Sequence, residues 1–127
     1  MSKIEIYTKF TCGFCFRAKA LLEGKDVSFE EAQMCSGIDP DQNGRQLVSL
    51  IAEAAAGGAE IIFTPEMTGL LDRDRSRAAG AIRGEADDLV LSAARSEARD
   101  ARIWVQLGSL AVNDPERSWD KWVNRSY

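Results

Sequence analysis

Strand-like and helix-like segments alternate along this chain of 127 residues, and this order limits the folds open to it. Short apolar or alternating runs predict strands at residues 4–8, 27–35, 59–64, 103–112 and 119–127. Helical spacing of apolar residues predicts helices at 11–23, 39–57, 73–81 and 86–101. This alternation favours an α/β fold in which helices cover a layered, partly parallel mixed sheet. The length suits one domain.

Capping residues mark the ends of several predicted segments. Asp39, followed by Pro40 and Gln42, combines an N-cap, a first-turn proline and a capping box, so the helix that it starts has the best signals in the chain. Thr11 is expected to cap the first helix, and Gly108 is expected to interrupt or bulge a strand.

Two further patterns are explained most simply by structure. The three tryptophans fall on predicted strands, where core or interface packing is expected rather than ligand stacking: Trp104, Trp119 and Trp122. The run Asp72–Arg77 alternates in sign, which is typical of a solvated loop or helix face.

The complete absence of histidine excludes several kinds of site within this chain. Ser-His-Asp and Cys-His arrangements, histidine-dependent metal sites and histidine proton shuttles all require it, and no metal site is expected. The formal net charge of −4 argues against nucleic acid as a partner. The sequence has no run of 18 apolar residues and no secretory leader pattern, so we expect no membrane association and predict a cytoplasmic location.

The composition changes near residue 33. Residues 1–33 contain four lysines and one arginine, whereas residues 34–127 contain ten arginines and one lysine. This break suggests two joined sequence histories, divided into segments 1–32 and 33–127. No Gly/Ser/Pro-rich linker separates them, so the two segments are expected to pack as one domain.

Cys12 and Cys15 lie three residues apart where a predicted strand gives way to a helix. On a helix this spacing brings the side chains within about 5–6 Å, close enough for a disulfide after modest adjustment. Unpaired N–H groups at the helix start favour a Cys12 thiolate, and Lys9 and Arg17 add positive charge nearby. The pattern predicts an attacking Cys12 and a resolving Cys15. Two incidental thiols are the alternative.

The residues around the two cysteines follow a familiar order. Tyr-Thr-Lys at 7–9, Cys-Gly-Phe-Cys at 12–15 and Arg-Ala-Lys-Ala-Leu-Leu at 17–22 together resemble the first β-α-β unit of glutaredoxins. The resemblance implies that Cys12 attacks, that Cys15 is its partner, and that Lys9 contacts a glutathione carboxylate. Gly-Phe replaces the usual Pro-Tyr between the cysteines. After residue 32 the family's Thr-Val-Pro segment and glutathione-binding Gly-Gly pair do not follow in order.

The remaining segment carries a different set of ordered motifs. Gln-Met-Cys-Ser-Gly at 33–37 is followed by Gly-Ala-Glu-Ile-Ile-Phe-Thr-Pro-Glu-Met at 58–67. Ile-Trp-Val-Gln-Leu-Gly-Ser-Leu-Ala at 103–111 and Trp-Val-Asn-Arg-Ser-Tyr at 122–127 come next. This order resembles the N-terminal part of a nitrilase-superfamily carbon–nitrogen hydrolase, which implies a partial nitrilase-like α/β layer and hydrolysis of a small, non-peptide amide.

Glu66 is the candidate catalytic residue of that second segment. It follows a predicted buried strand and a proline, at the strand end where α/β folds place active sites. A partly buried carboxylate there is expected to have a raised pKa and to serve as general base. The resemblance implies a Glu-Lys-Cys triad, but Lys121 does not match its lysine, and Cys35 is expected to be a core thiol.

Three functions therefore remain open from the sequence. The first, favoured by lineage, is a truncated carbon–nitrogen hydrolase with an incomplete catalytic set, carrying a glutaredoxin-like segment. The second is a thiol–disulfide oxidoreductase that uses Cys12 and Cys15, with no resident cofactor and glutathione as a possible co-substrate. The third is a non-enzymatic chimera. The last predicted strand ends at Tyr127 and is expected to leave an open sheet edge, which would allow homo-oligomerisation.

Overall fold

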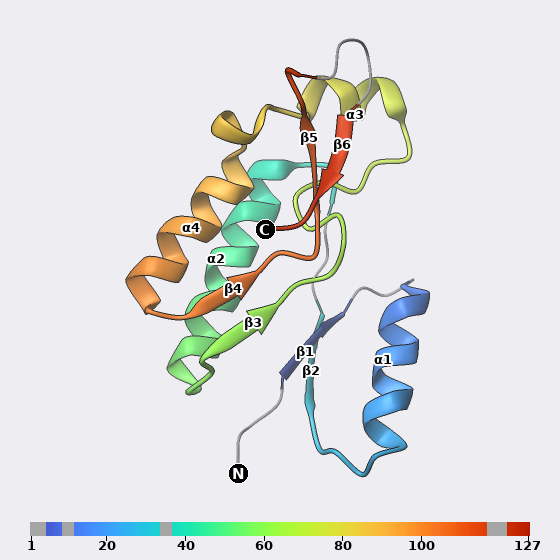
Figure 1. Cartoon of the computed structure of the whole chain (residues 1–127), viewed down its shortest axis with the longest axis vertical. Coiled ribbons are helices and arrows are strands. Elements are labelled where there is room, and N and C mark those ends of the chain that lie inside the picture. The colour runs from blue at the N-terminus through green and yellow to red at the C-terminus, as the bar shows by residue number, and fades with distance from the viewer. Residues whose placement is uncertain (1–4, 9–11, 34–36, 117–121) are drawn as a thin grey trace.

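The computed structural model describes residues 5–8, 12–33, 37–116 and 122–127, in which helices and strands alternate (Figure 1). In chain order the elements are β1 (Glu5–Thr8), α1 (Gly13–Glu23), β2 (Glu30–Gln33), α2 (Pro40–Ala56), β3 (Ile61–Phe63), α3 (Arg75–Ala81), the 3₁₀ turn η1 (Glu85–Asp87), α4 (Leu89–Ala101), β4 (Trp104–Gln106), β5 (Leu110–Asn113) and β6 (Trp122–Arg125). The predicted α/β class is confirmed.

The strands of the described residues form three separate two-stranded sheets, in place of the single mixed sheet that was expected. β1 pairs with β2 and β3 pairs with β4, both in parallel, whereas β5 and β6 are antiparallel. Each strand has only three or four residues. The predicted strand at 103–112 is divided at Gly108 into β4 and β5, as its glycine suggested. A nitrilase-like layering therefore stays a prediction.

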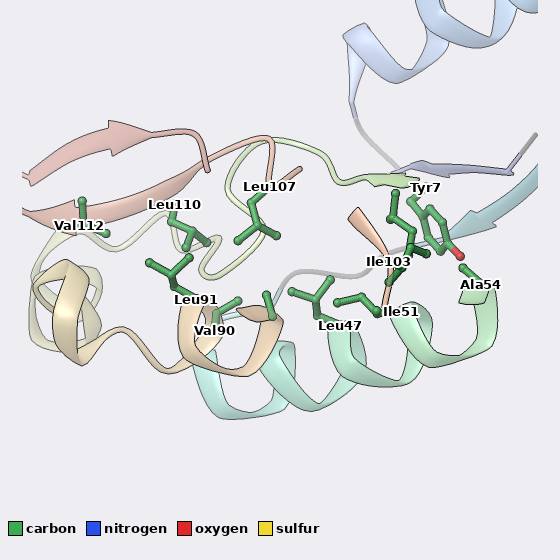
Figure 2. Packing of buried hydrophobic residues seen from close by; sticks show 12 residues of the cluster. Tyr7, Leu47, Ile51, Ala54, Val90, Leu91, Ile103, Leu107, Leu110 and Val112 are labelled. Atoms are coloured by element: carbon green, nitrogen blue, oxygen red, sulfur yellow. The ribbon is translucent and has the colours of Figure 1, made fainter. Parts of the chain in front are cut away.

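The main core lies between the helices α2 and α4 and the strands beside them (Figure 2). Leu47, Ile51, Leu91 and Val112 are among the side chains that are almost completely buried. Asp39 starts α2 as predicted, because its carboxylate accepts hydrogen bonds from the backbone N–H groups of Asp41 and Gln42.

Tyr7 of β1 connects the first β-α-β unit to this core. It is 8% exposed and belongs to the same buried cluster as Ile51 and Ala54 of α2. Its register partner Ala32 on β2 packs against that cluster from the same face of the β1–β2 pair. Figure 2 shows the Tyr7 ring beside Ala54 and Ile103. The β1-α1-β2 unit is therefore joined to the rest of the chain by apolar packing.

The strand predicted at 59–64 is shorter and less buried than expected. Only Ile62 of β3 is buried, while Ile61 and Phe63 are exposed. Trp104, the register partner of Ile61, is 78% exposed, so it is not a core residue, and the alternative of interface packing stays a prediction. The reason is that the β3–β4 pair buries only one face, and successive side chains alternate between the two faces. Trp122 packs against a second, smaller cluster as expected, and Trp119 lies outside the described residues.

Other predicted boundaries shift by a few residues. The second strand begins at Glu30 rather than at residue 27, and a helix at Arg75–Ala81 lies where a short one was predicted. In the charged run, Arg77 is exposed and its Nε lies 2.6 Å from Asp72 Oδ2.

The last residue, Tyr127, is paired through its backbone. Its N–H and C=O groups exchange two hydrogen bonds with those of Leu107, so the edge of Tyr127 that faces Leu107 is not open.

None of the helices formed by the described residues is long and apolar enough to span a membrane.

Candidate active site

The β1-α1-β2 unit places Cys12 at the start of α1. Cys12 has an extended backbone (φ −92°, ψ 107°) and is the N-cap of the helix, a position that the sequence had assigned to Thr11, which lies outside the described residues. The helix then continues through strong helix formers, including Ala18, Leu21 and Leu22, and ends at Gly24. The strand-to-helix change thus presents one thiol at a helix N-terminus.

The two cysteines are in direct contact through the helix backbone. The N–H of Cys15 donates a hydrogen bond to Cys12 Sγ over 3.2 Å. Both cysteine side chains are half-buried. The first turn of α1 contains no acidic residue that would oppose a negative charge on sulfur. An N–H donor and the positive end of a helix dipole are features that stabilise thiolates in proteins, and the role of Cys12 as the attacking thiol stays a prediction.

Charged and polar side chains fix α1 against β2 behind the dithiol. Lys19 Nζ lies 2.8 Å from Glu31 Oε1, and the Thr8 hydroxyl donates to the same oxygen over 2.5 Å. The hydrogen bond from Lys19, reinforced by that from Thr8, lowers the pKa of Glu31 below its usual value of 4.5. Through Glu31, these interactions connect β2 with the end of β1 and with α1.

Two aromatic side chains on α1 that were not predicted to matter are exposed, and only Phe14 lies between the cysteines. Phe14, between the cysteines, is 71% exposed, and the guanidinium of Arg17 lies 5.3 Å from its ring centroid. Phe16 is also exposed, with Lys19 Nζ 5.3 Å from its ring. Helical periodicity could have predicted that Phe14 and Phe16 are exposed, because both positions fall outside the helix face that includes Cys15 and Leu22.

Two other predicted residues lie outside the described part of the chain. Lys9, the expected glutathione contact, and Cys35, the expected core thiol, are both in this group, and their predicted roles stay predictions.

Glu66 lies on the loop after β3, on a different element from the dithiol. Its side chain is exposed, so the partly buried placement expected from the sequence is wrong. The loop is held on both sides of Glu66 by hydrogen bonds: Thr64 Oγ1 and Thr68 Oγ1 are 2.8 Å apart, and the Met67 N–H donates to Ser109 Oγ. The loop thus has a defined shape, and the role of Glu66 as a base stays a prediction.

A cavity of about 180 Å³ lies at the N-terminal ends of α2 and α4. Its lining includes Asp39, Asp88 and Leu110, but none of the predicted site residues. The residues that the structure describes contain no group of three or more Cys, Asp or Glu side chains arranged to hold a metal ion.

Comparisons with known proteins place the first segment in a family. The glutaredoxin family model matches residues 4–36. Glutaredoxin 3 of Escherichia coli K12 is 64% identical over 31 residues, which cover 24% of this chain and 37% of that protein. The chain therefore spans little more than a third of the length of this relative.

Longer matches come from two other organisms. A probable glutaredoxin of Synechocystis sp. is 37% identical over 83 residues, covering 56% of this chain and 90% of the relative. Glutaredoxin 1 of Rickettsia felis is 32% identical over 79 residues, covering 55% of this chain and 78% of the relative. These relatives favour the dithiol interpretation over the hydrolase interpretation. On this evidence, the chain belongs to the glutaredoxin family.

Proposed function

We propose that this chain is a thiol–disulfide oxidoreductase in which Cys12 attacks and Cys15 resolves. The observation that carries the proposal is the 3.2 Å hydrogen bond from the Cys15 N–H to Cys12 Sγ at the N-terminus of α1. This arrangement supplies a stabilised thiolate and places a second thiol one helical turn away. Those are the two groups that thiol–disulfide exchange requires.

The reaction proceeds in two exchanges. The Cys12 thiolate attacks one sulfur of a substrate disulfide, the substrate S–S bond breaks, and its electron pair leaves with the second substrate sulfur. The Cys15 thiolate then attacks Cys12 Sγ in the mixed disulfide and releases the first substrate sulfur as a thiolate. The substrate gains two electrons and its thiolates take up protons as their pKa values dictate, while Cys12 and Cys15 become a disulfide. Two equivalents of a small thiol such as glutathione restore the dithiol.

Glutathione is the proposed co-substrate, with Lys9 as a contact for one of its carboxylates. This assignment follows the glutaredoxin resemblance of residues 3–31, and regeneration of the dithiol by glutathione is favoured in a reducing compartment such as the cytoplasm. No resident cofactor takes part.

The direct test is reduction of a glutathione mixed disulfide by the wild-type chain and two variants. Cys12→Ser should abolish activity, because serine is not a nucleophile toward sulfur under these conditions. Cys15→Ser should retain attack and accumulate a mixed disulfide on Cys12, visible as added mass in intact-protein mass spectrometry. Equal activity of the wild type and Cys12→Ser, or no activity in either, would overturn the proposal.

The hydrolase prediction can be checked on the same preparation. Ammonia release from small ω-amides, lost in Glu66→Gln, would support it. We expect no release, since Lys121 does not match the lysine of the triad and Cys35 is expected to be a core thiol.

A further inference from the structure

Helix α1 contacts the rest of the β1-α1-β2 unit through one face only. Cys15, Ala18 and Leu22 are half-buried on that face, and no residue of α1 is fully buried. The flank that begins between the cysteines carries Phe14 and Leu21, which are 71% and 61% exposed. These two residues are seven positions apart, so they lie on the same side of the helix about 10 Å apart along its axis.

Arg17 lies between Phe14 and Leu21 on this flank. Its guanidinium carbon lies 5.3 Å from the centroid of the Phe14 ring, and the Arg17 side chain is exposed. An exposed guanidinium beside an aromatic ring keeps N–H donors with which it can bind a carboxylate. Arg17 makes no ion pair with any residue that the structure describes, whereas Lys19 is paired with Glu31. The strip therefore offers two apolar contacts and one available cation.

The strip begins at the reactive thiol. Phe14 is the second residue after Cys12, and Gly13 between them has no neighbouring atom within 4 Å of where a Cβ would lie. A substrate can thus approach Cys12 and Phe14 together. An apolar surface about 10 Å long is larger than a small disulfide covers, and it matches three or four residues of an extended polypeptide.

We propose that Phe14, Arg17 and Leu21 form a docking strip for a polypeptide disulfide that carries apolar side chains and a carboxylate beside its cysteine. The inference rests on the proposed function, because the strip serves the Cys12 dithiol. The bound polypeptide is the disulfide partner in the two exchanges described above, so the chemistry adds no new reactant. Arg17 and Phe14 set specificity, and the cysteines carry out the reaction.

The test compares three disulfides with one enzyme. Two are octapeptides with an internal disulfide and a leucine next to one cysteine, differing only in an adjacent Asp or Lys; the third is bis(2-hydroxyethyl) disulfide. The wild type should reduce the Asp peptide with a kcat/KM roughly tenfold above that for the Lys peptide. Arg17→Glu should reverse this order when each peptide rate is divided by the rate of the same variant with the small disulfide, because the loss of positive charge near Cys12 affects all three substrates.

Matched variants separate the strip from the dithiol. Phe14→Ser should lower kcat/KM for the Asp peptide several-fold, and Phe16→Ser, which removes an exposed aromatic from the opposite flank, should not. Equal rates for the Asp and Lys peptides would overturn the strip while leaving the proposed function intact. Arg17 dependence equally strong with a glutathione mixed disulfide would also overturn it, since the occupant would then be glutathione.

Binding keeps the inference testable without turnover. Fluorescence anisotropy with labelled peptides and the Cys12→Ser variant should show tighter binding of the Asp peptide than of the Lys peptide. If the wild type reduces no disulfide but this preference is present, the proposed function fails and the strip stands. If no preference is present, the strip fails whatever the enzyme reduces.

Discussion

Residues 5–33 and residues 37–127 use their helices in opposite ways. α1 has no buried residue and exposes two phenylalanines, whereas α2 buries five residues, including Leu47 and Ile51, against α4 and its neighbours. Cys12, the proposed nucleophile, is the N-cap of the exposed helix, and most of the apolar core surrounds the buried helices. A nucleophile must be reached by its substrate, so the region that carries the chemistry can contribute little to the core. The larger segment therefore supplies stability to the smaller one.

The junction between these regions should give the largest effect. Tyr7→Ala removes the aromatic side chain that inserts from β1 into the main core, and should lower the free energy of unfolding by about 3–4 kcal/mol. Urea unfolding followed by circular dichroism measures this loss. Limited proteolysis should cut β1-α1-β2 before the rest of the chain. Unchanged stability would mean that the two regions do not share a core.

A matched pair of leucines compares the two helices directly. Leu47→Ala in α2, where the side chain is 1% exposed, should cost about 3 kcal/mol of stability through cavity formation. Leu21→Ala in α1, where the side chain is 61% exposed, should change it by less than about 0.5 kcal/mol. Both changes in the free energy of unfolding are calculated from the urea midpoints, with the same dependence of free energy on urea concentration for each variant. Similar losses for the two variants would contradict the contrast between the helices.

Two glycines test the loop that carries Glu66. A Cβ on Gly108 would lie 2.6 Å from the carbonyl carbon of Pro65, so Gly108→Ala forces a backbone shift and should destabilise the chain by about 1–3 kcal/mol. Gly80→Ala in α3 meets no atom within 4 Å and should be neutral or slightly stabilising. Thermal denaturation distinguishes them, and disulfide reduction should be unaffected in Gly80→Ala.

The smallest effect concerns pH and the network behind the dithiol. Because its folded pKa lies below the usual 4.5, Glu31 adds stability above that pH and loses it as the pH falls through the lowered value. Glu31→Gln should therefore melt lower than the wild type at pH 7, and the difference should shrink toward pH 3. The difference should be modest, since both partners are partly exposed. If the difference in melting temperature between the wild type and Glu31→Gln persists at pH 3, the effect is due to packing and not to the charge of Glu31.

The local elements were largely predictable because their signals are local. Asp39 and Pro40 start α2 as their side-chain chemistry requires. Cys12 is the N-cap of α1 and Cys15 lies in its first turn, one residue away from the start that was predicted at Thr11. Burial was less predictable. Ile61, Phe63 and Trp104 look like core residues, but which face of a strand is covered depends on distant segments.

The sequence by itself determined the order of helices and strands, the position of the dithiol at a helix start and the family to which the chain belongs. Those depend on neighbouring residues and on spacing along the chain. Only the tertiary structure decided that Tyr7 joins the β1-α1-β2 unit to the core, that Glu66 is exposed, and that Phe14 and Arg17 are exposed and in contact with each other. Burial and exposure are set by contacts between residues far apart in the sequence, and no local pattern encodes them.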